Sequence, residues 1–100
     1  MKKTPANQSH KIELPEMLDL RAATPLAAQL LMRRGEDVIL DASAVQRLGG
    51  QCLQILLSAK ATWEADGAQL RIVDSSPDFV EGLELLGIQS KQLLEEENAA

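Results

Sequence analysis

One hundred residues make one compact domain, and a hydrophobic content of 45% is enough to bury a core. Ten Lys and Arg against fifteen Asp and Glu give a net charge of −5, which disfavours nucleic acid and anionic membrane surfaces as partners. With one cysteine, Cys52, and one histidine, His10, the chain cannot form an internal disulfide or a zinc site built from Cys and His. We find no signal peptide or long apolar stretch, and therefore expect a cytoplasmic protein without direct membrane insertion.

The N-terminal third of the chain predicts a tail, a strand and a helix. Residues 1–9 are polar and lack periodicity, so we expect a flexible tail. Residues 10–14 alternate between apolar and charged side chains, which predicts a half-buried edge strand, and residues 17–20 are a candidate for a second short strand. Thr24 followed by Pro25 resembles an N-cap and a first helical residue, so a helix is predicted over 25–34.

The rest of the chain alternates between strands and helices. The apolar run Val38-Ile39-Leu40 predicts a central strand buried on both faces. A helix is predicted over about 50–66, a strand over 70–73, and a helix from Pro77, capped by Ser76. Ser90 is a candidate cap for one or two last helical turns. Strands joined by helical crossovers indicate an α/β domain with its helices mainly on one face of the sheet. We place this domain at residues 10–90, followed by an acidic, partly helical tail over 91–100.

Few residues have the chemistry of a catalytic site. Gly49-Gly50 could bind an anion, but a glycine pair more often allows a sharp turn into a helix. Cys52 could be reactive near a helix N-terminus, although its apolar neighbours favour a buried, inert thiol. Asp19 and Asp41 end apolar segments, where carboxylates commonly accept loop N–H groups. Trp63 is either a packing anchor or an interface anchor. We therefore expect no enzyme activity, cofactor or metal.

Three segments carry a family resemblance, in their order along the chain. Leu18-Asp19-Leu20 precedes a helix, Val38 to Ser43 reads as a central strand ending in Asp, and Leu48 to Leu53 leads into a Leu-rich helix. This order resembles the STAS domain, the fold of bacterial anti-sigma-factor antagonists. The resemblance implies a mixed sheet of four to five strands with three to four helices mainly on one face.

The resemblance also implies a site at the start of the second helix. There the family has a D-S-S-G-L turn whose second serine is phosphorylated, and this chain has Gln51 at that position. A neutral carboxamide cannot gain the charge of about −1.5 to −2 that phosphorylation adds. The partner surface is thus expected to remain without this switch. We assign to it Arg47, Gly49, Gly50, Gln51, Cys52 and Gln54.

Residues 46–59 are similar to stand-alone STAS proteins of bacterial chemotaxis systems. This similarity implies a histidine-kinase-like or response-regulator partner and a role in signal transduction. Two alternatives stay open: an anti-sigma-factor antagonist that uses another hydroxyl, Ser43 or Ser58, and a STAS subunit of an ABC-type lipid transporter. A weak homodimer is also left open, because exposed leucines can support self-association.

Overall fold

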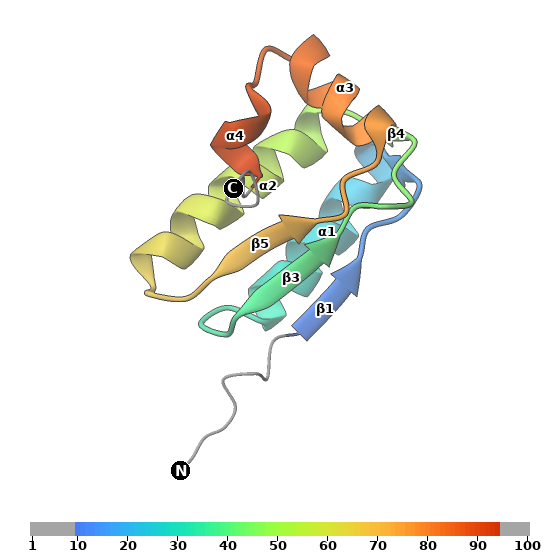
Figure 1. The fold of residues 1–100 in the computed structure, drawn as a ribbon. Coiled ribbons are helices and arrows are strands. Elements are labelled where there is room, and N and C mark those ends of the chain that lie inside the picture. The colour runs from blue at the N-terminus through green and yellow to red at the C-terminus, as the bar shows by residue number, and fades with distance from the viewer. Residues whose placement is uncertain (1–9, 95–100) are drawn as a thin grey trace.

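The computed structural model describes residues 10–94, so the predictions for residues 1–9 and 95–100 lie outside it. Its centre is a sheet of three strands, β1 (His10–Glu13), β3 (Val38–Asp41) and β5 (Leu70–Val73), in the order β1-β3-β5. Figure 1 shows β3 between the other two strands, which confirms that this apolar strand is central.

A second, smaller pairing joins β2 (Met17–Leu18) to β4 (Arg47–Leu48). The expected mixed sheet of four to five strands is therefore wrong for residues 10–94, where three strands form one sheet and every strand pair is parallel. A helix separates the paired strands in sequence, which makes them run in one direction. The last hydrogen bond from β1 to β3 is that of the Leu14 N–H, and Pro15, which has no N–H, follows it.

Four helices are described: α1 (Leu20–Met32), α2 (Gly50–Ala65), α3 (Pro77–Leu85) and α4 (Ser90–Leu93). In Figure 1, α1 and α2 lie behind the sheet, and α3 lies beyond the carboxyl ends of the strands. The other face of the sheet is covered by no helix among the described residues. The predicted α/β class with helices mainly on one face is thus confirmed.

This one-sided cover gives the strands an alternating burial pattern. Val38 and Leu40 of β3 are fully buried, whereas Ile39 between them is only partly buried. Ile39 lies beside Lys11 of β1 and Arg71 of β5 on the face without helices. The expectation that the β3 strand is buried on both faces is therefore wrong. A short continuous apolar run does not reveal whether a second layer of helices exists.

Helix α1 begins five residues earlier than predicted. Asp19, and not Thr24, is its N-cap, and one carboxylate oxygen of Asp19 accepts hydrogen bonds from the N–H groups of Arg21 (3.0 Å) and Ala22 (3.2 Å). Pro25 lies inside the helix, where it removes one backbone hydrogen bond. The sequence prediction took Thr24 as the cap because proline follows it. In the structure Asp19 is the cap, because its carboxylate accepts from two N–H groups of the first turn.

The later helix starts are closer to expectation. The Ser76 hydroxyl oxygen accepts a hydrogen bond from the Phe79 N–H at 3.0 Å, which confirms the predicted cap of α3. Ser90, however, is the first residue of α4 and not its cap; Gln89 precedes it, and the Gln89 N–H donates to the Gln92 side chain. Gln89 at the N-cap and Gln92 three residues later form a capping box, in which each residue caps the other.

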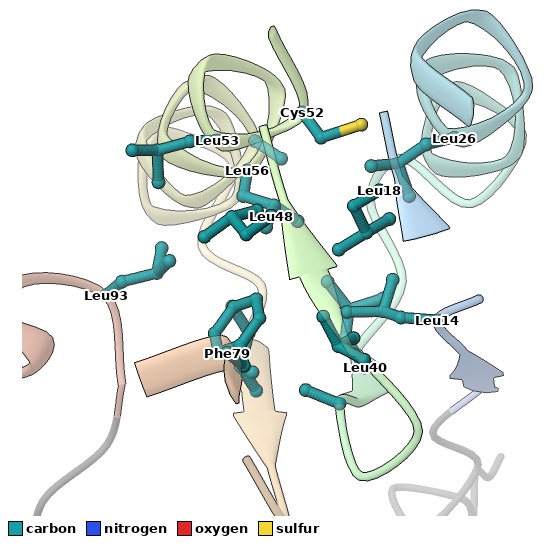
Figure 2. Packing of buried hydrophobic residues seen from close by; sticks show 14 of the residues in the cluster. Leu14, Leu18, Leu26, Leu40, Leu48, Cys52, Leu53, Leu56, Phe79 and Leu93 are labelled. Atoms are coloured by element: carbon teal, nitrogen blue, oxygen red, sulfur yellow. The ribbon is translucent and has the colours of Figure 1, made fainter. Parts of the chain in front are cut away.

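The core lies between the buried face of the sheet and the helices, and Figure 2 shows residues of β2, β3, β4 and all four described helices that contribute to it. Trp63 is a packing anchor: it is 2% exposed, and its indole N–H donates to the Glu36 carbonyl at 2.6 Å. Leu93 of α4 is fully buried and Leu94 packs against the core. The domain therefore extends beyond residue 90, into the segment predicted as a tail.

We expect Asp19→Ala to lower the free energy of unfolding by about 1 kcal/mol, because two first-turn N–H groups lose their acceptor. Thr24→Ala is the matched control: Thr24 is exposed within α1, so its removal should leave stability within about 0.5 kcal/mol of the wild-type value. Urea unfolding followed by circular dichroism measures both variants. A larger loss for the Thr24 variant would contradict the assignment of the cap.

Candidate functional site

The N-termini of α1 and α2 lie side by side because β2 and β4 pair directly before them. Leu18 lies opposite Leu48, and the Gly49 N–H donates to the Leu18 carbonyl at 2.8 Å. A Cβ atom on Gly49 would lie 3.2 Å from that carbonyl oxygen, closer than most such contacts. Gly49 therefore allows the start of α2 to approach the start of α1.

Cys52 makes a second link between the two helix starts. Its side chain is fully buried and points from α2 toward α1 in Figure 2. The thiol lies 3.3 Å from the Asp19 carbonyl oxygen, in position to donate a hydrogen bond to it. Burial raises the pKa of the Cys52 thiol, and the negative charge of Asp19 raises it further. The structure thus confirms that the thiol is buried and gives no support to Cys52 as a reactive group.

The first turn of α2 differs from those of α1 and α3. Its N-cap, Gly49, provides no side-chain acceptor, whereas the side chains of Asp19 and Ser76 cap α1 and α3. The first turn of α2, like that of α1, also contains no acidic residue. The first backbone bond of the helix runs from the Leu53 N–H to the Gly49 carbonyl at 3.1 Å, and Gly50 and Gln51 before it are exposed. Uncapped N–H groups and the positive end of the helix dipole favour a hydrogen-bond acceptor or negative charge from outside.

Most of the predicted partner residues lie together on the surface. Arg47, Gly50, Gln51 and Gln54 are exposed and Gly49 is partly buried, all within β4 and the first turns of α2. The assignment of Cys52 to the partner surface is corrected by its burial. The helix period turns Gln51 toward solvent and Cys52 toward the core, where no partner can contact it.

Three further residues extend this surface and were missed from the sequence. Met17 lies opposite Arg47 in the β2–β4 pair and is 43% exposed. Leu20, the first residue of α1, is 72% exposed, and Arg21 beside it is also exposed. Recognising Asp19 as the helix cap would have found Leu20 and Arg21, because the residues directly after a cap belong to the first turn; Met17 lies before the cap and is placed by the β2–β4 pairing. We call Met17, Leu20, Arg21, Arg47, Gly50, Gln51 and Gln54 the α2-start surface.

An apolar groove of about 320 Å³ runs between α1 and α2 from Gln54. Leu31, which is 68% exposed, lines it from α1, and Ile55 lines it from α2. Arg34, at the far end, forms a hydrogen-bonded ion pair with Asp66, 2.8 Å from Nε to Oδ2. This pair lowers the pKa of the Asp66 carboxyl. The groove thus gives the α2-start surface an apolar neighbour.

The other acidic candidate is structural. One Asp41 carboxylate oxygen accepts a hydrogen bond from the Ser43 N–H at 2.9 Å, and this bond lowers the pKa of Asp41. Asp19 and Asp41 therefore both accept N–H groups at segment ends, as predicted. Within residues 10–94, no group of three or more His, Cys, Asp or Glu could hold a metal ion, and no helix has the length and apolar character of a membrane span.

The fold and the site together define a small α/β domain built around an exposed, uncapped helix N-terminus. A family model described as "Mlab, STAS domain" matches residues 2–95, so the chain belongs to the STAS domain family. No curated protein and no solved structure matches the chain. STAS domains of this kind are protein-interaction modules related to anti-sigma-factor antagonists.

The burial of Cys52 leads to a prediction about thiol chemistry. In the native protein at pH 8, Cys52 should react with Ellman's reagent about 100-fold more slowly than in urea, because the thiol is shielded and its pKa is raised. The control is Ser58→Cys in a Cys52→Ala background, which places a thiol at an exposed position of the same helix. Equal native rates for the two thiols would show that Cys52 is accessible.

Proposed function

We propose that this STAS domain is a non-catalytic interaction module that docks on a protein partner through the α2-start surface. The observation that carries the proposal is the exposure of Gln51 in the first turn of an uncapped helix, next to the exposed apolar side chains of Met17 and Leu20. Apolar groups that surround unsatisfied N–H donors suit a protein partner that supplies a carboxylate or carbonyl.

The absence of a hydroxyl at residue 51 supports a mode of action without this switch. The resemblance places Gln51 at the family's phosphoacceptor position. Its side chain is exposed there, but a carboxamide has no hydroxyl that could accept a phosphate and gain negative charge. In our proposal the domain acts by permanent shape. It shifts the equilibrium between two states of its partner by the difference in its affinity for them.

The proposed partner is a chemotaxis histidine kinase or a response regulator in the bacterial cytoplasm. The similarity of residues 46–59 to stand-alone chemotaxis STAS proteins supports this partner. The excess of acidic residues, −5 overall, also favours a protein over a nucleic acid. Binding to the kinase, the regulator and an ATP-binding transporter subunit from the same genome, measured by calorimetry, tests the choice. Binding to the transporter subunit alone would replace the chemotaxis proposal.

Phosphorylation of another hydroxyl is the remaining alternative, and it has a direct test. Ser43 and Ser58 are both exposed. Incubation of the full chain with a cognate serine kinase and ATP, followed by mass spectrometry, should detect no added phosphate. A phosphate on either serine would overturn the proposed action by permanent shape.

Added negative charge on the α2-start surface should weaken binding. We expect Arg47→Glu and Gln51→Glu each to raise the partner Kd by about tenfold, because each adds negative charge where an acceptor docks. Gln69→Glu is the matched control, since Gln69 is exposed at the other end of α2, after its C-terminus. An unchanged Kd for both α2-start variants would eliminate this surface as the docking site.

A further inference from the structure

The outer edge of β1 has backbone groups that face away from the sheet. The N–H groups of His10 and Leu14 donate to the Asp37 and Asp41 carbonyls at 3.0 and 2.9 Å, toward β3. Because strand residues alternate, the N–H and C=O groups of Lys11 and Glu13 point to the opposite side. No strand among residues 10–94 pairs with that side. β1 is therefore an edge strand with donors and acceptors in register for another strand.

The two edges of the sheet differ. At the β5 edge, the Lys60 ammonium group of α2 lies 3.4 Å from the Leu70 carbonyl oxygen and donates to it. Such a charged side chain across an edge is a common protection against strand pairing. At the β1 edge, the nearest feature is a hollow of about 660 Å³ lined by Lys11, Ile12, Glu13, Gln29, Met32 and Arg33. Strand addition is thus favoured at β1 only.

We infer that two copies of this chain pair through β1, antiparallel about a twofold axis, with Ile12 opposite Ile12 of the second copy. This register brings Lys11 opposite Glu13 of the second copy, and Glu13 opposite its Lys11. Both residues carry the outward-facing backbone groups, so each opposed pair exchanges two N–H···O=C bonds. The result is one continuous sheet through both copies, and Pro15 ends the pairing on each side.

Charge complementarity supports this register. The side chains of Lys11 and Glu13 lie on the face of the sheet without helices, and the Lys11 side chain is 57% exposed. Within one copy, Glu13 lies directly opposite Asp41, and Asp41 forms an ion pair with Lys11 at 3.7 Å from Nζ to Oδ2. In the dimer, Lys11 of the second copy lies opposite Glu13 and gives it a positive partner. Opposite charges directly across an antiparallel pair stabilise it, and like charges destabilise it.

Apolar surface at the same edge supports a second copy as the occupant. Ile12 is only partly buried, and Met32 at the end of α1 is 75% exposed. Both line the hollow beside β1. The twofold arrangement covers Ile12 with its own counterpart, which removes apolar surface from water.

The test is sedimentation equilibrium of the full chain between about 10 µM and 1 mM, a range suited to a short edge-strand interface. We expect a monomer–dimer equilibrium. Lys11→Glu and Glu13→Lys should each weaken dimerisation by about tenfold, since each places like charges opposite one another twice per dimer. Glu64→Lys, on α2 and away from β1, is the control with the same change in net charge as Glu13→Lys, and it should leave the dimer unchanged.

Two further variants separate pairing from folding. The double variant Lys11→Glu/Glu13→Lys restores complementary charges and should regain dimerisation. A mixture of the two single variants should form a heterodimer, because all its opposed pairs are again Lys against Glu. A chain that stays monomeric up to 1 mM overturns the proposal. A dimer that does not respond to the charge variants overturns it as well.

Discussion

The hydrogen bond from the Gly49 N–H to the Leu18 carbonyl determines the arrangement of the site. It closes the short β2–β4 pair and places the beginnings of α1 and α2 next to each other. Only a residue without a side chain permits this approach at its full closeness, because a Cβ atom would lie 3.2 Å from the carbonyl oxygen. The burial of Cys52 and the exposure of Gln51 follow from this arrangement, since they occupy successive positions on the first turn of α2.

The same pair also positions α3. A Cβ atom on Gly82 of α3 would lie 3.0 Å from the Leu48 Cβ, so α3 packs tightly against β4 because residue 82 is glycine. β4 is thus held from two sides, by β2 and by α3, although it contains only two residues. A rigid β4 keeps Arg47 in a constant position relative to the first turn of α2. Such fixed geometry suits a surface that recognises a partner by shape.

Periodicity predicted those elements whose burial has a regular pattern. The strands at residues 10–13, 38–41 and 70–73 and the helices starting at Gly50 and Pro77 agree with expectation, because alternation, glycine pairs and a Ser-Pro start are local signals. The start of α1 was wrong because two candidate caps, Asp19 and Thr24, compete within six residues. Tertiary contact with Gly49 and Cys52 favours the earlier one, and no local pattern records that contact.

The extent of the sheet was equally beyond local signals. The run Val38-Ile39-Leu40 is compatible with cover on both faces, and only the placement of the helices shows that Ile39 lies on the face without them. In the candidate site, too, some residues have a local sequence signal and others depend on the tertiary arrangement. Gln51 and Arg47 were found from their position in a motif. Leu20 was missed because its exposure depends on Asp19 being the cap of α1, and Met17 was missed because its place beside Arg47 depends on the β2–β4 pairing.

The two surfaces of the domain are separate in the structure, and this has a mechanistic consequence. The α2-start surface belongs to the carboxyl side of the β-strands and the helix layer, whereas the β1 edge lies along the sheet. A copy bound at β1 would therefore leave Gln51 and Arg47 exposed in both protomers. A dimer of this kind presents two identical docking sites. When a partner with two binding surfaces is bound at one site, the second site is held nearby at a high effective concentration.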